Sequence, residues 1–273
     1  MMTSGLGLAF ALGLSICATA ATAGCNGAPD ACTSANGTYH IVMPPGRDDP
    51  MPAIMFLHGH ASEGLGTLSN TGMVDVMLQR GYAVIAPDGQ PRKGASGRSW
   101  GFHPDRPSRR DETAFLIEVA DDAAARFGLD RERILLAGFS IGGSMTSYVA
   151  CSVPGAFAAY APVAGSFWRP HPESCAGPVR LFHMHGLADR TVPMAGRQIA
   201  PGFMQGDVLE AMEIWRATNT CPDVPPAVRQ GIYSVQRWNR CAPGADLELA
   251  LHAGGHAIPN GWAEMALDWF EDR

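Results

Sequence analysis

A serine set among glycines is the first feature of this sequence that could do chemistry. Ser140 stands at the centre of G-F-S-I-G, between Gly138 and Gly142, directly behind the apolar run 133–138. A sharp strand-to-helix turn needs glycines there, because larger side chains would collide across it. Such a turn exposes the hydroxyl at the N-terminus of a helix, whose dipole favours developing negative charge. The pattern predicts a nucleophilic serine; an ordinary glycine-rich turn is the alternative.

A serine hydroxyl is a weak nucleophile at neutral pH, so a base has to accept its proton. Where a serine occupies this kind of turn, its partners follow along the chain in the order acid, then histidine. His256 lies in a glycine-rich turn after the last predicted strand, and we predict that it is the base. Asp189 follows the strand predicted at 179–186, where its carboxylate would orient the imidazole.

Other histidines and carboxylates compete for these two roles. His252 lies inside a strand pattern, and His183 and His185 flank a methionine at a strand end, so we assign all three to packing. Asp207 and Glu210 fall in a predicted helix, which makes them weaker candidates for the acid.

Attack on an ester carbonyl creates an oxyanion, which needs two backbone N–H donors. We predict the amide of Ile141, directly after the serine, as the first donor. The second donor is expected in the turn that follows the strand 52–59, and we choose the amide of His60. His58 is expected to support this turn through hydrogen bonds rather than to react.

A loop at 90–110 is long for a compact domain and rich in Gly, Pro, Arg and Ser, which favours a functional surface. Trp100 and Phe102 in this loop, and Trp168 further on, are candidate substrate contacts. An exposed aromatic ring can stack on an aromatic acid or lie along a polyester chain. Packing of the loops is the alternative role for these rings.

The elements that must position these residues follow from hydrophobic patterning. Short apolar runs alternate with helical patterns, which predicts an α/β fold with a mostly parallel sheet and helices on both faces. The clearest helix, 111–128, opens with acidic residues, ends at Gly128, and carries an apolar stripe. Strands are predicted at 37–44 (an edge strand), 52–59, 82–89, 133–138, 156–165, 179–186 and 247–255, and further helices at 68–79, 207–217 and 260–270.

Composition limits the remaining possibilities. A length of 273 residues, 46% of them hydrophobic, suits one globular domain, which we expect to span 24–273. The net charge is −6 and there is no basic run, which argues against nucleic acid as a partner. The sequence leaves the oligomeric state open.

The first 23 residues have the pattern of a secretory signal peptide. Residues 6–17 are nearly all apolar, and small residues at 21–23 fit a cleavage site. The apolar stretch is short for a bilayer span, and no later segment is apolar enough to cross a membrane. We predict a cleaved signal at 1–23 and a secreted or periplasmic protein. An uncleaved anchor, or a lipid on Cys25, is the disfavoured alternative.

Cysteine usage agrees with export. Of seven cysteines, Cys17 would leave with the signal, and the remaining even set of six favours disulfides in an oxidising compartment. The chain has no C-x-x-C motif, so a metal site is not expected, and the predicted chemistry needs no metal or organic cofactor. Proximity in the sequence suggests the pairs Cys25–Cys32, Cys151–Cys175 and Cys221–Cys241.

Several motifs along the chain are informative in combination. They are the run 111–165 and the segments F-L-H-G-H, A-P-D-G, H-M-H-G-L-A-D-R-T-V-P and G-G-H-A-I-P. Together, over about 37–270, they resemble the secreted esterases grouped as polyhydroxybutyrate depolymerases and feruloyl esterase C-like enzymes. The resemblance implies an α/β-hydrolase fold and cleavage of carboxylic esters through an acyl-enzyme, with a triad of Ser140, Asp189 and His256.

The same resemblance implies the pairing of Cys221 with Cys241. The sequence departs from the family pattern at Ile258, where tryptophan is frequent, and at the helix opening 111–113. Members of the family that act on solid polyester usually carry a linker and a binding module, and neither is seen in this sequence. We expect the substrate to be a small-molecule or polymeric ester, and we favour the esters of polyhydroxybutyrate and of hydroxyalkanoate oligomers. A feruloyl, other aromatic or acetyl (carbohydrate) ester is the enzymatic alternative, and a catalytically silent surface-binding protein the non-enzymatic one; a peptidase is a poorer choice.

Overall fold

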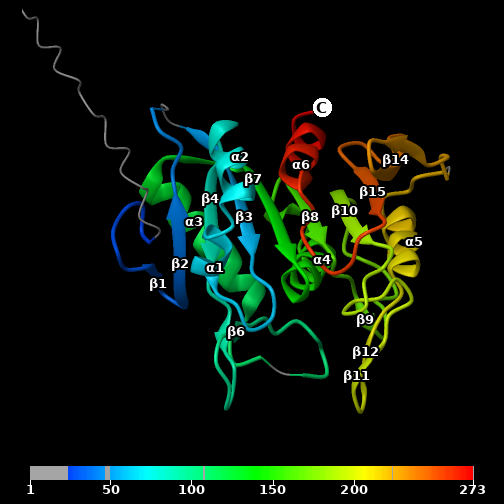
Figure 1. The fold of residues 1–273 in the computed structure, drawn as a ribbon, viewed down its shortest axis with the longest axis horizontal. Coiled ribbons are helices and arrows are strands. Elements are labelled where there is room, and N and C mark those ends of the chain that lie inside the picture. Colours follow the sequence, from blue (N-terminus) through cyan, green and yellow to red (C-terminus); the bar gives the residue numbers. More distant parts are fainter. Residues whose placement is uncertain (1–23, 47–49, 107, 223, 273) are drawn as a thin grey trace, which may run out of the picture.

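A computed structural model describes residues 24–46, 50–106, 108–222 and 224–272. The signal peptide predicted at 1–23 lies outside them. A sheet of ten strands runs through the molecule (Figure 1). From edge to edge its strands are β1 (Cys32–Ser34), β2 (Gly37–Val42), β4 (Ala83–Pro87), β3 (Met51–Leu57), β7 (Leu129–Phe139), β8 (Ala159–Val163), β10 (Arg180–Gly186), β15 (Asp246–His252), β14 (Tyr233–Trp238) and β13 (Val228–Gln230).

The centre of this sheet is parallel, and antiparallel strands flank it on both sides. The six strands from β4 to β15 pair in parallel, whereas β1, β2, β14 and β13 pair antiparallel. The prediction of an edge strand at 37–44 is wrong. Residues 32–34 turn back along β2 and cover its outer side, so that β1 forms the edge instead.

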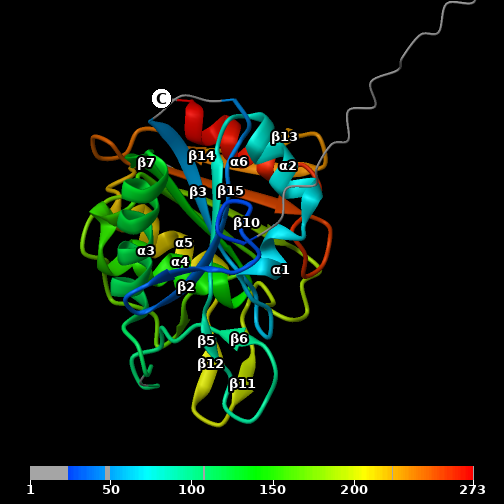
Figure 2. The same cartoon turned by 90° about the vertical axis from the view of Figure 1, so that its left-hand side faces the viewer.

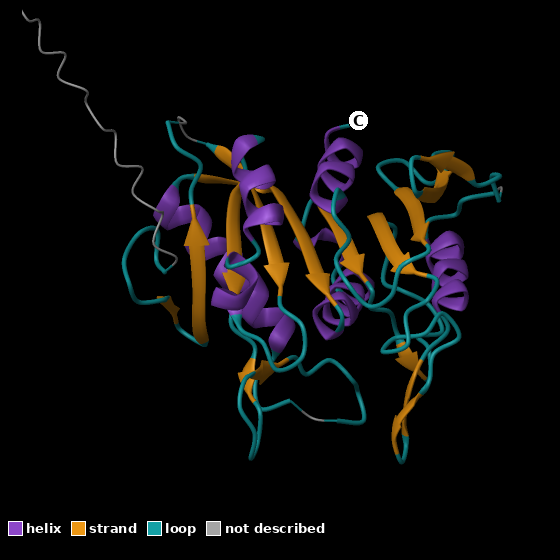
Figure 3. Cartoon of the chain, in the orientation of Figure 1, coloured by secondary structure: helices purple, strands orange, loops and turns teal. Residues whose placement is uncertain are grey.

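Helices cover both faces of the sheet (Figures 2 and 3). This arrangement confirms the mostly parallel, doubly covered sheet that the sequence predicts. One face carries α3 (Glu112–Phe127), α4 (Ile141–Ser152) and α5 (Val208–Thr218), and the other carries α1 (Gly64–Leu68), α2 (Thr71–Gln79) and α6 (Trp262–Glu271). A short 3₁₀ turn at Pro154–Ala156 follows α4.

Each face has its own apolar core. Phe115, Leu116 and Val119 of α3 are fully buried against one face, and Trp262 and Trp269 of α6 pack on the other. Burying one such large side chain stabilises the fold by about 2–3 kcal/mol. The two cores therefore hold the central strands from both sides and keep their carboxyl ends in register.

Helix α3 begins and ends where its sequence predicts. The side chain of Asp111 accepts a hydrogen bond from the backbone N–H of Ala114 at 3.0 Å, and this caps the first turn. Gly128 ends the helix with φ of 67°, in the left-handed conformation that glycine adopts without a steric penalty. The two caps define the bounds of the helix, and the first of them directly follows the loop 90–110.

Two small antiparallel elements project beyond the carboxyl ends of the central strands (Figures 1 and 2). One is the pair β5 (Gln90–Pro91) and β6 (Arg98–Ser99); the other comprises β9 (Trp168–Arg169), β11 (Gln198–Ala200) and β12 (Phe203–Gln205). Ligand sites in sheets of this type lie at the carboxyl ends of the parallel strands. The projections therefore stand where a substrate would enter.

Three disulfides join the cysteines in the pairs that sequence proximity suggested: Cys25–Cys32, Cys151–Cys175 and Cys221–Cys241. With its sulfur bonded to Cys32, Cys25 has no free thiol to carry a lipid, so this pairing speaks against the lipid-anchored alternative. No helix within the described ranges combines the length and the apolar character needed to cross a membrane.

Candidate active site

Ser140 stands between the end of β7 and the start of α4, in a strained backbone conformation. Its φ is 58° and its ψ −121°, a region that residues other than glycine rarely adopt. A Cβ at Gly138 would lie 2.5 Å from the carbonyl oxygen of Gly142, and one at Gly142 would lie 2.3 Å from that of Leu57. The two glycines are therefore required for β7, β3 and α4 to approach this closely around the serine.

Three side chains from separate segments meet at this turn. Nε2 of His256 lies 2.9 Å from Oγ of Ser140, and Nδ1 of His256 lies 2.7 Å from Oδ2 of Asp189. The serine and the aspartate are buried, and the histidine is half-buried. With Nδ1–H donating to the carboxylate, Nε2 is free to accept the proton of the serine hydroxyl.

Asp189 is held by its own loop. Its Oδ1 accepts the backbone N–H groups of Thr191 and Val192, each at 2.8 Å. His185 Nε2 lies 2.8 Å from the carbonyl oxygen of Val192, and its Nδ1 lies 3.1 Å from Nε2 of His183. Burial lowers the pKa of both histidines, so they remain neutral hydrogen-bonding groups beneath the loop. This agrees with the structural role that the sequence assigns to them.

The other rivals lie elsewhere. Asp207 caps α5, where its side chain accepts the backbone N–H groups of Leu209 and Glu210. His252 is buried at the end of β15, and its Nδ1 accepts the N–H of Gly254 at 3.1 Å. Neither side chain bonds to Ser140 or His256 within the described part of the chain.

His58 supports the turn that carries His60. Its Nε2 accepts the N–H of Gly89 at 3.0 Å, and its Nδ1 lies 2.8 Å from the carbonyl oxygen of Gly59. These two bonds fix the neutral tautomer that carries its proton on Nδ1. Burial lowers the pKa of His58 to about 4, and the bond to Gly59 opposes this shift only in part. The ring therefore acts as a neutral brace between two loops.

His60 and Ile141, whose amides are predicted to bind an oxyanion, lie around the same cavity as the serine. Among the described residues, neither N–H donates to a backbone carbonyl. Neither donor is therefore already engaged by the backbone, as an oxyanion site requires.

This cavity has a volume of about 530 Å³, and the three aromatic residues that the sequence singles out line it. Phe102 and Trp168 are half-buried and lie edge to face, with ring centroids 5.3 Å apart. Trp100 is only 5% exposed, and its indole N–H donates to the carbonyl of His58 at 2.9 Å. Trp100 is thus packed into the wall, while the other two rings remain partly accessible. A second cavity of about 380 Å³ meets the site on the side of His256.

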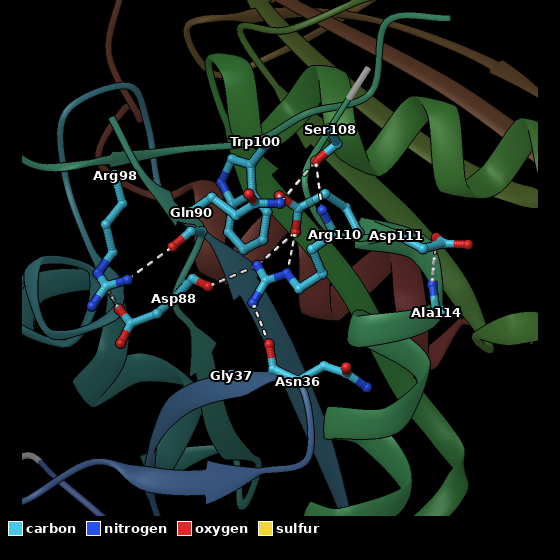
Figure 4. Close-up of polar contacts among 12 residues, drawn as sticks. Asn36, Gly37, Asp88, Gln90, Arg98, Trp100, Ser108, Arg110, Asp111 and Ala114 are labelled. Carbon is cyan, nitrogen blue, oxygen red and sulfur yellow. Dashed lines mark hydrogen bonds and ion pairs between the residues drawn. The ribbon is translucent and has the colours of Figure 1, made fainter. Parts of the chain in front are cut away.

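A polar network that sequence reasoning missed anchors the loop 90–110. Arg110 donates to the backbone carbonyls of Asp88 and Asn36, each at 3.1 Å (Figure 4), and its Nη2 lies 2.6 Å from the carboxylate of Glu112. Gln90, at the other end of the loop, donates to Ser108 at 2.8 Å. Arg110 therefore ties one end of the loop to residues that adjoin β2 and β4, and the bond from Gln90 joins the two ends of the loop to each other.

Asp88 is the centre of a second part of this network. Its carboxylate accepts the hydroxyl of Thr38 at 2.7 Å and the N–H of Gly64 at 2.9 Å, and it lies 3.6 Å from Nε2 of His40. Burial would raise the pKa of Asp88, but the bonds from His40, Gly64 and Thr38 outweigh it and lower the pKa to about 2. The A-P-D-G motif is the one signal in the sequence that could have pointed to this residue.

Comparison with known proteins links this geometry to esterases. Residues 37–175, about half of the chain, match the family described as "Esterase PHB depolymerase". A bifunctional acetylxylan esterase/xylanase of Neocallimastix patriciarum is 26% identical over 227 residues, which cover 80% of this chain and 30% of that protein. Feruloyl esterase B of Piromyces equi is 26% identical over 234 residues, which cover 81% of this chain and 42% of that protein. The chain thus spans less than half the length of these two relatives.

Solved structures share the fold at low sequence identity. An acetyl xylan esterase from Aspergillus awamori superposes with a TM-score of 0.64 at 15% identity, covering 86% of this chain and 94% of that one. A carboxylesterase from Mesorhizobium loti superposes with a TM-score of 0.61 at 17% identity, covering 89% of this chain and 98% of that one. The likeness shows the α/β-hydrolase fold that the sequence predicts.

Proposed function

Because the chain belongs to the esterase PHB depolymerase family, we propose that it is a secreted serine esterase that hydrolyses carboxylic esters through an acyl-enzyme. The observation that carries the proposal is the hydrogen-bonded series from Ser140 through His256 to Asp189, at 2.9 and 2.7 Å. A nucleophile, a base and an orienting carboxylate in this geometry are the requirements for acyl transfer.

The proposed reaction has two halves. His256 Nε2 takes the proton from Oγ of Ser140 as that oxygen attacks the ester carbonyl, and the imidazolium then protonates the departing alcohol oxygen. Water, deprotonated by the same histidine, hydrolyses the acyl-serine and releases the acid. In both halves the amides of His60 and Ile141 would hold the oxyanion, and Asp189 would stabilise the imidazolium.

The substrate class has two candidates within this chemistry. Esters of hydroxybutyrate or other hydroxyalkanoate oligomers are favoured by the family, which is named for such a polymer. Aromatic or acetyl esters of carbohydrates are favoured by the relatives named feruloyl esterase and acetylxylan esterase, and by the accessible rings of Phe102 and Trp168. Hydroxybutyrate oligomers, methyl ferulate and acetylated sugars, compared as substrates, would separate the two.

The disulfide bonds support export of the protein from the cytoplasm. Three disulfides fit an oxidising compartment such as the periplasm or the extracellular medium. Mass spectrometry of the protein recovered from the culture medium or periplasm would test this, because a secreted form should begin close to Gly24.

A chromogenic short-acyl ester tests the enzymatic proposal. We expect the wild-type protein to release the chromophore and Ser140→Ala to lose at least about a thousandfold in kcat. Equal turnover by both proteins would contradict the proposal. No turnover by the wild type of any ester in the comparison would favour the silent binding protein instead.

A further inference from the structure

The cavity beside Ser140 has a strongly cationic wall. Among the described residues that line it, Glu112 is the one carboxylate, and its charge is balanced by Arg110 at 2.6 Å. This concentration of positive charge occurs in a chain whose net charge is −6. We call five of the lining residues the cationic rim: Arg92, Lys93, Arg106, Arg109 and Arg197.

The cationic rim has no carboxylate partners of its own within the described ranges. Arginines on other surfaces do have such partners: Arg80 lies 2.8 Å from Asp268, and Arg131 lies 2.6 Å from Asp121. An anion that enters the cavity would therefore meet cations without first displacing a protein carboxylate.

Three of the guanidinium groups are also held in position. Each donates one hydrogen bond to a backbone carbonyl, and a guanidinium has five N–H donors, so further donors remain for a ligand. A fixed guanidinium loses less conformational freedom when it binds a carboxylate than a mobile side chain does. The acceptors of Arg92, Arg109 and Arg197 are the carbonyl oxygens of Ser96, Pro91 and Thr191, each at 2.8 Å.

The field of the cationic rim extends to the turn beside the serine. The pKa of His60 is lowered first by burial and then by the positive charges of Arg92 and Arg106. His60 lines the same cavity as Ser140, so part of the cationic rim acts on the space where a substrate would sit. The aromatic rings of Phe102 and Trp168 complete the wall and offer an apolar surface to the body of that substrate.

On the basis of the proposed esterase function, we infer that the substrate is an anionic ester, whose acyl or alcohol part carries a carboxylate that the cationic rim binds. The scissile carbonyl lies at Ser140, and the part between the carbonyl and the carboxylate packs on the aromatic wall. Hydroxyalkanoate oligomers end in a free carboxylate and fit this description. Methyl ferulate and simple sugar acetates carry no such charge.

Two matched pairs of substrates test the inference. In the first, mono-p-nitrophenyl glutarate is compared with p-nitrophenyl pentanoate, which places the charge on the acyl side. In the second, a hydroxybutyrate dimer is compared with the same dimer capped as its terminal amide, which places the charge on the alcohol side. We expect kcat/KM of the charged member to exceed that of the neutral one by about tenfold in at least one pair. The preference should shrink as ionic strength rises from about 0.01 M to about 0.5 M, because salt screens exposed charges.

A double variant connects the preference to the cationic rim. Lys93→Gln with Arg106→Gln removes two exposed cations whose side chains donate no hydrogen bond within the described residues. Arg106 also lies over the ring of Phe203, 5.7 Å from its centroid, so circular dichroism is used to check that the variant keeps its fold. We expect the ratio of kcat/KM for the charged member to kcat/KM for the neutral member to fall about threefold to tenfold. Arg229→Gln, which removes an exposed cation on β13, is the matched control and should leave the preference unchanged.

The outcomes are distinguishable. Equal kcat/KM within both pairs, with neutral esters hydrolysed by the wild type and not by Ser140→Ala, would overturn the inference and leave the proposed function standing. A preference that neither high salt nor the double variant reduces would also overturn it. The salt series uses the wild-type protein. It therefore decides the question even if circular dichroism shows that the double variant is misfolded.

Discussion

Oδ2 of Asp189 lies 2.7 Å from Nδ1 of His256, while Oδ1 of the same carboxylate accepts two backbone N–H groups of its own loop. Both oxygens are therefore engaged, which prevents the carboxylate from rotating away. Such a fixed acceptor selects the imidazole tautomer whose Nε2 faces the serine. The orientation of the base is thus determined by a loop more than sixty residues away in the chain.

Replacement of this carboxylate by an amide should disable the base without unfolding the protein. In Asp189→Asn the side-chain NH₂ can face Nδ1, which favours the tautomer with its proton on Nε2. We expect kcat for a chromogenic ester to fall roughly a thousandfold to ten-thousandfold. Asp207→Asn is the matched control, because asparagine also caps a helix well. Activity that falls equally in both variants would contradict the assignment.

Gly142, the second residue after the serine, should tolerate no side chain. A Cβ in Gly142→Ala would meet the carbonyl oxygens of Leu57 and His58 at 2.3 and 2.6 Å. We expect a loss of about 3 kcal/mol or more in the free energy of unfolding, together with loss of activity. Gly155→Ala is the control, because nothing lies within 4 Å of its added Cβ. Chemical denaturation of both variants gives the comparison, and equal stabilities would refute the packing argument.

A buried glutamate should make stability depend on pH. Burial raises the pKa of Glu248 from 4.5 to about 7, although Arg237, 3.6 Å away, opposes the shift. The folded protein then binds more protons than the unfolded chain between about pH 4.5 and 7. The free energy of unfolding therefore falls as pH rises through that window. Glu248→Gln should flatten the dependence and be more stable above pH 7 by on the order of 1–3 kcal/mol.

Thermal unfolding at several pH values measures this difference. The comparison between wild type and Glu248→Gln isolates one group, because all other titrating residues are shared. Glu132→Gln, at an exposed position, is the control and should follow the wild-type curve. Parallel curves for wild type and Glu248→Gln would show that the buried carboxyl does not titrate in this range.

The disulfides should differ in their contribution to stability. Cys151–Cys175 closes a loop with a sequence separation of 24, and Cys25–Cys32 one with a separation of 7. Because a longer loop loses more entropy when it is closed, replacing the first pair by alanine should reduce the free energy of unfolding by about 3 kcal/mol, and the second pair by less. Urea denaturation of the two double variants checks the order, and the reverse order would contradict loop entropy as the cause.

The sequence predicts the central elements well because their signals are local. Strand β3 and helix α3 begin and end within two residues of their predicted bounds, since a continuous apolar run and clear capping residues define them. Strands β11 and β13 were missed because they are short and mostly exposed, so they lack hydrophobic alternation. Helix α1 was missed because it is five residues long and contains two glycines.

The same distinction applies to the site. The order of the motifs is enough to select Ser140, Asp189 and His256 as candidates, because each follows a recognisable strand, and the structure brings the three side chains together. The network of Asp88 and Arg110 could not be predicted, since it depends on contacts between distant segments. The cationic rim is likewise assembled from two loops, and in the sequence its residues are simply polar loop positions.

The bond from the indole of Trp100 to the carbonyl of His58 joins the pocket wall to the turn that presents the amide of His60. A substrate that pushes the indole aside would also tilt that turn. We therefore expect a poorly fitting ester to bind more weakly, because displacing the buried indole costs binding energy, and to react more slowly, because a predicted oxyanion donor is misplaced. Discrimination between esters should then appear in kcat as well as in KM, and a binding assay alone would miss the part in kcat.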